Sequence, residues 1–190
     1  MGRPARIQGE GMTFHITSRG VRREPLFRDR LDFVRLLELV DRATRKFNWV
    51  CLAYCLMTNH FHLVLRLRDA NLSAGMHLIN HRYACRFNER YELKGHAFDA
   101  RFGAALIEKE AHLLEAMRYV PLNPVRAGLC HDPAQWEWSS FRSTAHLVRP
   151  PGFLATQEAR ACFPGTTARE QGDGYAQFVR SSIDVALSLT

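Results

Sequence analysis

Apolar residues recur along the chain with two different spacings, and these spacings predict its strands and helices. Apolar and polar positions alternate over 13–18, which is the period of a half-buried strand. Apolar residues recur at steps of three and four over 29–47, and again over 72–90, so each of these segments lines one face of a helix. We therefore expect one strand followed by a helix, and a second helix further along the chain.

The segment 49–57 lacks a polar side, which indicates a central strand covered on both faces. Thr58 and Asn59 form a tight turn and 60–67 is the returning strand, so a β-hairpin is predicted. Strict alternation along 49–57 gives two sets of side chains. One face carries Cys51, Ala53, Cys55 and Met57, and the other carries Leu52, Tyr54 and Leu56.

The order of the elements defines the expected fold. A strand over 102–107 and a third helix from Glu110 to about Val120 complete the series β-α-β-β-α-β-α. This order predicts an α+β, ferredoxin-like fold, a four-stranded antiparallel sheet with helices packed on one face. Proline and glycine interrupt the pattern near residue 150. We therefore expect a main domain over 1–149 and a C-terminal helical appendage over 150–190, whose last helix lies within 169–187.

Composition adds a cellular compartment and a class of partner. Of the 190 residues, 46% are hydrophobic, which is enough for one full core, and no stretch reaches the roughly 18 apolar residues of a membrane helix. Five cysteines, an odd number without a CxxC pair, favour a reducing compartment and a cytoplasmic protein.

The charge of the chain is dominated by arginine. There are 26 basic and 19 acidic residues, a net charge of +7, and all the basic residues except Lys46, Lys94 and Lys109 are arginines. Because a guanidinium grips phosphate with a planar fork, this composition favours a nucleic-acid partner. An arginine-rich composition that reflects only a GC-rich genome is the alternative.

Two histidines stand at the start of the returning strand, in the stretch MTNHFHLVL (57–65). Alternation places His60 and His62 on one face, and Phe61 and Leu63 on the opposite face beneath the helices. Two imidazoles at this spacing can bind one divalent metal ion, on a face of the sheet that no predicted element covers. The alternative is a pair of surface histidines at the end of a strand.

A tyrosine and an asparagine form a second candidate set. If the third helix continued, Tyr119 and Asn123 would lie one turn apart on one face. A phenol beside a metal ligand suits a tyrosine nucleophile, because the metal polarises the phosphate that the phenolate attacks. Alternatively, Asn123 and Pro124 begin a separate short helix that Gly128 ends, and Pro121 disturbs the helix before it.

Six stretches, in the right order, resemble one family. MTNHFHLV (57–64) resembles the MPNHxHLL signature of the single-tyrosine HUH transposases, which are IS200-like. RYVPLNPVRAGL (118–129) resembles the RYIxxNPVRAGL signature of their REP-associated tyrosine transposase branch. The other matches are ITSRG (16–20), ANLS (70–73), GHAF with RF (95–102) and WEWSSF (136–141), and the resemblance runs from about Arg3 to Phe141.

The resemblance implies a function and a set of site residues. It implies that His60, His62 and Asn123 hold Mg²⁺ or Mn²⁺. Tyr119 would attack a phosphodiester of single-stranded DNA, leaving a 5′-phosphotyrosine link and a free 3′-OH that can rejoin strands. Family members recognise DNA hairpins from repetitive extragenic palindromes, partly through the loop that corresponds to Ser18-Arg19-Gly20. The resemblance also implies a bacterial, nucleoid-associated protein in the cytoplasm, and it leaves monomer and homodimer open.

Several residues beyond these signatures are candidates for DNA contact. The possible phosphate ligands are Arg22, Arg23, Arg66, Arg101 and Arg126, although each of them has an ordinary role as a surface arginine. His15 is interpreted as a core or surface histidine, and Trp136 and Trp138 as residues that pack against the body.

The chain departs from the family pattern without losing a catalytic residue. Thr58 replaces a proline in the turn, Val21 replaces a polar residue of the loop, and 103–104 lacks a common Lys-Ser pair. Two further functions stay open, a non-catalytic protein that binds DNA hairpins and a metal-dependent nuclease that uses water.

Overall fold

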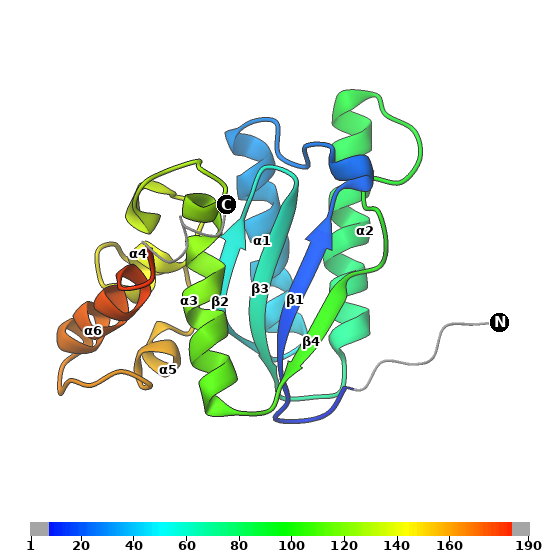
Figure 1. Ribbon diagram of the computed structural model, residues 1–190. Coiled ribbons are helices and arrows are strands. Elements are labelled where there is room, and N and C mark those ends of the chain that lie inside the picture. Colours follow the sequence, from blue (N-terminus) through cyan, green and yellow to red (C-terminus); the bar gives the residue numbers. More distant parts are fainter. Residues whose placement is uncertain (1–7, 184–190) are drawn as a thin grey trace.

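The computed structural model describes residues 8–183 and shows one antiparallel sheet with helices on both faces (Figure 1). Within these residues the sheet has four strands in the order β2-β3-β1-β4. The strands are β1 (Thr13–Arg19), β2 (Trp49–Leu56), β3 (His60–Leu67) and β4 (Gly103–Ile107). The longer helices are α1 (Arg30–Lys46), α2 (Leu72–Tyr91), α3 (Glu110–Arg126) and α6 (Ala168–Arg180). The short ones are η1 (Val21–Arg23), η2 (Pro133–Gln135), α4 (Phe141–Thr144) and α5 (Thr156–Arg160).

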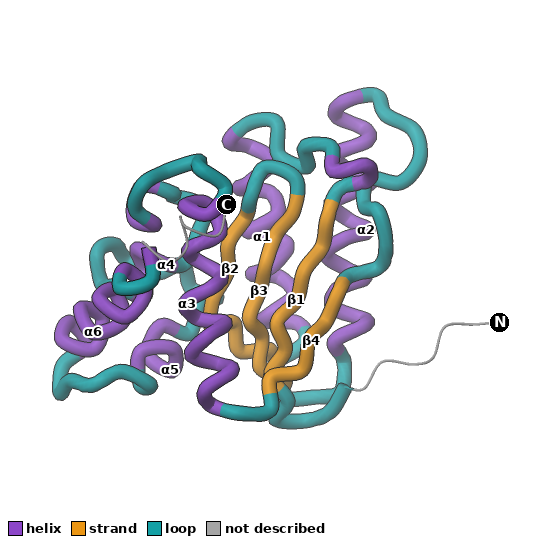
Figure 2. Tube along the Cα trace, viewed as in Figure 1, coloured by secondary structure: helices purple, strands orange, loops and turns teal. Residues whose placement is uncertain are grey.

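The sheet topology confirms the predicted fold class. β2 and β3 form the predicted β-hairpin, and β1 pairs antiparallel with both β3 and β4. α1 and α2 lie side by side behind the sheet in Figures 1 and 2. They bury the apolar positions of β3 that the pattern assigned to the helical face, Phe61, Leu63, Leu65 and Leu67.

A β-bulge in β2 corrects the predicted facing of two side chains. The pairing of β2 with β3 shifts register between Cys51 and Ala53, so one extra residue is inserted there. Cys51 therefore lies with Tyr54 in the core beneath α1 and α2, whereas Leu52 lies with Ala53 in the core on the other face. The prediction for Cys51 and Leu52 was wrong because a periodic pattern does not reveal a bulge.

The second face of the sheet is also covered, contrary to the expectation of an open face. α3 lies across the β2 side of this face, with α4, α5 and α6 beside it (Figure 1). Their apolar side chains form a second core with β2, and its members include Met117, Val120, Phe141, Tyr175 and Val179. β4 stays largely exposed, so these helices leave most of β4 uncovered on this face.

α3 continues through Pro121 and Pro124 to Arg126, so its earlier predicted end was wrong. Each proline lacks an N–H and frees the carbonyl four residues before it. The carbonyl that Pro121 frees, that of Met117, accepts a hydrogen bond from the hydroxyl of Tyr175 on α6 (3.4 Å). Tertiary packing thus supplies a donor that the local sequence lacks.

Asn123 supplies a second donor inside α3 and is not the N-cap of a new helix. Its Nδ2 donates to the Val120 carbonyl, which Pro124 frees (3.3 Å), and to the Tyr119 carbonyl (2.9 Å). Gly128, which was predicted to end a separate short helix, ends α3 instead. Its φ is +67° and its N–H donates to the carbonyl three residues earlier (2.9 Å), as in a Schellman motif.

The C-terminal segment and the tryptophans pack against the body. α6 begins one residue before the range predicted for a last helix and ends within it, while 184–187 of that range, like Arg3, falls outside the described residues. Trp138 stacks on Phe33 with ring centroids 4.4 Å apart, and Trp136 donates its indole N–H to the β2 backbone (2.9 Å), as predicted. None of the described helices combines the length and the apolar character needed to cross a bilayer.

Candidate active site

A cavity of about 610 Å³ lies between α3 and the strands β1, β3 and β4, on the sheet face opposite α1 and α2. Figure 2 shows α3 in front of the sheet on this side. The polar residues that line the cavity are His15, Thr17, Arg19, His62, His112, Glu115, Arg118, Tyr119 and Arg126. The predicted nucleophile and one predicted metal ligand therefore share a cavity.

The register of β1 and β3 brings polar side chains together. Thr17 lies opposite His62 and Arg19 lies opposite His60, so these four side chains share one face. His15 stands two residues before Thr17 and shares that face as well. The sheet thus gathers three histidines where the sequence pattern indicated two.

Four aromatic rings form one contact group, and three of them, His15, His62 and Tyr119, line the cavity. Nε2 of His15 lies 2.9 Å from Nδ1 of His62, and the two rings stack with centroids 5.1 Å apart. The Tyr119 ring meets both edge-on, with its centroid 5.8 Å from that of His15 and 5.7 Å from that of His62. The ring centroid of His60 lies 5.0 Å from that of His62. Tyr119 on α3 therefore contacts both His15 and His62.

Burial holds the imidazoles in their neutral form. It lowers the pKa of His62 to about 3, with smaller contributions from His15, His60 and Arg19. It lowers the pKa of His60 to about 4, with a smaller contribution from Arg19, and it lowers the pKa of His15 as well. At neutral pH each ring therefore keeps one nitrogen with a free lone pair.

The histidine pair suits a divalent metal ion. Nε2 of His62 is buried without a hydrogen-bond partner within residues 8–183, although buried polar atoms are nearly always paired. The described part of the chain holds no cluster of three or more His, Cys, Asp or Glu side chains arranged for a metal. A third protein ligand would therefore be of another type, such as the amide oxygen of Asn123.

Asn123 presents its oxygen away from the helix backbone. Both hydrogen-bond partners of its side chain are carbonyls, so the atom that contacts them is Nδ2 and Oδ1 points elsewhere. None of the hydrogen bonds between described residues joins Asn123 to His60 or His62. Its role as a metal ligand stays a prediction, which rests on its place one turn after Tyr119.

A guanidinium lies over the ring of the predicted nucleophile. The guanidinium carbon of Arg126 is 4.9 Å from the Tyr119 ring centroid, which is a cation–π distance. Arg19 lines the same cavity from β1, whereas Arg118 is paired with Glu115. Two of the predicted DNA-binding arginines, Arg19 and Arg126, thus line the same cavity as Tyr119.

Comparison with known proteins identifies the family. The model of the family described as "Transposase IS200 like" matches residues 9–123, which is more than half of the chain. The chain belongs to the IS200-like transposase family. This confirms the family predicted from the histidine and tyrosine motifs.

Two solved structures extend the comparison. One, a REP-associated tyrosine transposase bound to a REP hairpin, is 20% identical with a TM-score of 0.64 over 82% of this chain and 92% of that chain. The other, a candidate transposase from Deinococcus radiodurans R1, is 12% identical with a TM-score of 0.44 over 63% and 94% of the two chains. The first likeness shows a shared fold. Among curated proteins, none matches the chain significantly.

In this IS200-like transposase, two residues of the predicted DNA-binding loop are internal. Ser18 belongs to β1 and is 2% exposed, and its hydroxyl accepts from Nδ2 of Asn80 (3.0 Å). The loop that was expected to begin at Ser18 therefore begins at Gly20, because β1 extends to Arg19. Gly20 is buried too, and an added Cβ would lie 2.4 Å from the Glu24 carbonyl oxygen.

Arg22 and Arg23 are exposed and have an unusual backbone. Their φ values of +52° and +61° lie in the left-handed region, which residues other than glycine rarely adopt. The Arg23 carbonyl accepts from Nδ2 of Asn59 (2.9 Å), the residue before His60. This basic loop therefore lies directly beside the turn that carries the first predicted metal ligand.

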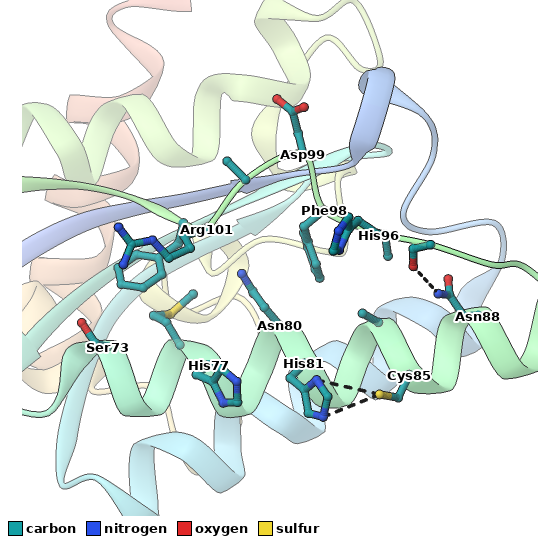
Figure 3. Close-up of a pocket in the computed structure, with 16 residues that line it drawn as sticks. Ser73, His77, Asn80, His81, Cys85, Asn88, His96, Phe98, Asp99 and Arg101 are labelled. Atoms are coloured by element: carbon teal, nitrogen blue, oxygen red, sulfur yellow. Dashed lines mark hydrogen bonds between the residues drawn. The ribbon is translucent and has the colours of Figure 1, made fainter. Parts of the chain in front are cut away.

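The remaining two arginines lie away from Tyr119. Arg101 lines a separate cavity of about 690 Å³ between α2 and 95–102, into which Asn80 points (Figure 3). α2 covers the opposite face of the sheet, so Arg101 and Tyr119 do not share a cavity. Arg66 forms an ion pair with Glu158 of α5 (2.9 Å), which reduces its availability for phosphate.

Three residues beside the two predicted metal ligands, His15, Thr17 and Asn59, were not predicted from the sequence. His15 and Thr17 alternate with Phe14 and Ile16. The alternation that predicted β1 therefore also marked them as polar positions facing away from the core beneath α1 and α2. Only the pairing of β1 with β3 places them beside His62.

Proposed function

We propose that the protein cleaves and rejoins single-stranded DNA by transesterification, with Tyr119 as the nucleophile and Mg²⁺ or Mn²⁺ held by His60, His62 and Asn123. The observation that supports this proposal is the edge-on contact between Tyr119 and His62, whose buried Nε2 lacks a partner within residues 8–183. A tyrosine ring in contact with an imidazole that has an unpaired nitrogen, at the wall of a cavity, is an arrangement typical of a catalytic site.

In the proposed reaction the phenolic oxygen of Tyr119 forms a bond to phosphorus as the bond from phosphorus to the 3′ oxygen breaks. The phenol gives up its proton to water in the cavity, and the departing oxygen takes up a proton to become a 3′-OH. The other DNA product stays attached as a 5′-phosphotyrosine. Because one phosphodiester replaces another, the 3′-OH of a strand can attack this link, join the strands and release Tyr119.

The protein residues prepare the site for this chemistry. A bound Mg²⁺ or Mn²⁺ would polarise the scissile phosphate. His60 and His62 would offer lone pairs to it at neutral pH, because burial lowers their pKa to about 4 and about 3. Arg126 over the Tyr119 ring and Arg19 on the strand wall would add positive charge beside the bound phosphate.

We propose hairpin DNA as the substrate, with Arg22 and Arg23 among its contacts. The solved transposase that shares this fold was bound to a REP hairpin. The net charge of +7 and the exposed arginines of the loop suit a polyanion. The hydrogen bond from Asn59 to the Arg23 carbonyl joins this loop to the His60 turn, so DNA bound to the loop would lie near the histidines.

A denaturing gel tests the mechanism. The protein is mixed with Mg²⁺ or Mn²⁺ and end-labelled single-stranded DNA that carries a hairpin from palindromes flanking its own gene. The wild type is expected to give a retarded, protease-sensitive band. Tyr119→Phe and the double variant His60→Ala, His62→Ala are expected to give none. Tyr54→Phe, which alters a core tyrosine beneath the opposite face of the sheet, is the matched control and should behave as the wild type does.

Two other results would assign a different function. Cleavage that persists in Tyr119→Phe would indicate a nuclease that uses water and leaves no covalent intermediate. Tight binding without cleavage, with both metals and several hairpins, would indicate a non-catalytic protein that binds DNA hairpins. Circular dichroism of each variant establishes that it is folded before its activity is compared.

A further inference from the structure

We infer that Asn59 and His15 are positioning residues that set the tautomers of His60 and His62, so that both rings present Nε2 without its hydrogen to the metal. This inference rests on the metal site of the proposed function. It adds to that proposal the two side chains that orient the ligands.

The orientation of Asn59 follows from its contact with the backbone. Its side chain lies 2.9 Å from the Arg23 carbonyl, and a carbonyl only accepts, so the contacting atom is Nδ2. Oδ1 then faces Nδ1 of His60 at 2.7 Å. Because Oδ1 also only accepts, Nδ1 of His60 carries the hydrogen. A neutral ring has one such hydrogen, so Nε2 of His60 holds the lone pair.

The turn itself holds Asn59 in this position. The N–H of Gly20 donates to the Asn59 carbonyl (2.8 Å), while the Asn59 side chain donates to Arg23 on the other side of the same loop. The His60 ring is therefore oriented by a partner that is bonded to the 20–23 loop through both its backbone and its side chain.

His15 has the corresponding role for His62. Nδ1 of His62 lies 2.9 Å from Nε2 of His15 and 3.4 Å from Oγ1 of Thr17, while its own Nε2 has no partner within residues 8–183. With the hydrogen on Nδ1, His62 donates to His15 and leaves a lone pair at Nε2. The other tautomer would leave an unpaired N–H buried at Nε2, and orphaned buried N–H groups are rare.

The two arrangements together make one site. His60 and His62 stand on the same face of β3 with ring centroids 5.0 Å apart, and each has its Nδ1 engaged by a different partner. Outer partners of this kind orient a ligating histidine and make its free nitrogen more basic. Loss of such a partner weakens metal binding while the ligands themselves remain in place.

Binding of Mn²⁺ to the full-length protein without DNA, measured by calorimetry, tests the inference. His15→Phe keeps an aromatic ring but removes the acceptor, and Asn59→Leu keeps the size of the side chain but removes its amide. Each is expected to weaken Mn²⁺ binding by about 10- to 100-fold. His15→Gln places an amide group near the position of Nε2 and is expected to recover most of the affinity. Thr13→Val, on the same face of β1 but outside the cavity, is the matched control and should bind as the wild type does.

Nitrogen-15 NMR of the imidazoles in the metal-free protein gives a second measurement, which a merely structural role would not change. In the wild type His60 and His62 should both carry their hydrogen on Nδ1, and His62 should show a mixture of tautomers in His15→Phe. Unchanged Mn²⁺ affinity in His15→Phe and Asn59→Leu, or an Nε2-protonated His62 in the wild type, would overturn the inference. Failure of the wild type to bind Mn²⁺ would instead overturn the metal site of the proposed function, and the inference with it.

Discussion

His62 is the residue that best distinguishes this site from an ordinary core. It is 4% exposed, one of its nitrogens lacks a partner within residues 8–183, and its ring touches a tyrosine from another element. Burying an unpaired polar atom lowers stability, and sequences accept such a loss mainly at functional sites. His15, whose contact with His62 was not predicted, is part of the same arrangement.

The pKa values of the histidines predict acid sensitivity of the metal-free protein. Unfolded histidine titrates near about 6.5, whereas burial lowers the folded pKa of His60 to about 4 and that of His62 to about 3. Between these values the unfolded state binds more protons, so the free energy of unfolding should fall as pH is lowered through this range. Urea titrations in a chelator across the range measure it. In the double variant His60→Asn, His62→Asn the free energy of unfolding should depend less on pH. An unchanged pH dependence would contradict the lowered pKa values of His60 and His62.

Arg126 is predicted to act through its planar guanidinium and not only through its charge. Arg126→Lys keeps the charge but loses the fork that binds phosphate and the group that lies over the Tyr119 ring. We expect formation of the covalent product to slow by about 10-fold or more. The free energy of unfolding should change by about 1 kcal/mol, because both side chains are half-buried and a cation–π contact is worth from about 0.5 kcal/mol when exposed to about 2 kcal/mol when desolvated.

Single-turnover rates of the covalent product measure the effect of Arg126→Lys. Arg45→Lys, an exposed arginine of α1 paired with Asp41, is the control. Equal rates for Arg126→Lys and the wild type would mean that a point charge is sufficient at this position.

At the scale of the element, α3 carries the catalytic hypothesis because it stays continuous. Two prolines interrupt its hydrogen bonding, and two side chains, Asn123 from the helix itself and Tyr175 from α6, donate to the carbonyls that the prolines free. Without these two hydrogen bonds, a break in the helix at Pro121 would separate Asn123 from the turn that carries Tyr119. The C-terminal helix therefore contributes to the geometry of the site without lining the cavity.

Tyr175→Phe is predicted to destabilise the protein through this helix. The variant leaves the Met117 carbonyl unpaired and should lower the free energy of unfolding by about 1 kcal/mol. Pro121→Ala restores an N–H in α3, so Tyr175→Phe should cost less in that background. A double-mutant cycle from urea unfolding measures the coupling. Equal costs in both backgrounds would show that the hydroxyl does not serve this carbonyl.

At the scale of the whole molecule, the sheet separates two hydrophobic cores. One lies beneath α1 and α2, and the other is formed by β2, α3 and the C-terminal helices. The second core reaches β4 only at Ile107, and the cavity with Tyr119 lies at that limit, where the sheet face passes from covered to exposed. The extent of the C-terminal cover thus positions the candidate active site.

Removal of residues 150–190 is predicted to destabilise the remainder of the chain. The deletion takes away Phe163, Tyr175 and Val179 and exposes the apolar face of α3 that they cover. We expect a lower melting temperature by circular dichroism and increased binding of a hydrophobic dye. A truncated chain that melts at the temperature of the full chain would show that 1–149 folds independently of the appendage.

The sequence by itself determined most of the elements and the candidate chemistry. The pattern of apolar residues and turns located the four strands and the first two long helices, and alternation along 60–67 put His60 and His62 on one face. The spacing of Tyr119 and Asn123 held once α3 was seen to be continuous. These features are local, because each depends on residues a few positions apart and on the geometry of a single element.

Only the tertiary structure decided the rest. The bulge at Cys51, the register that sets Thr17 and His15 beside His62, and the hydroxyl of Tyr175 that serves Met117 all join residues far apart in the chain. The cover of the second sheet face, which makes His62 buried and neutral, depends on helices that follow the sheet in sequence. Periodicity reports which side of an element is apolar. It does not report which partner that side, or the polar side opposite, will meet, because pairing and packing depend on the whole chain.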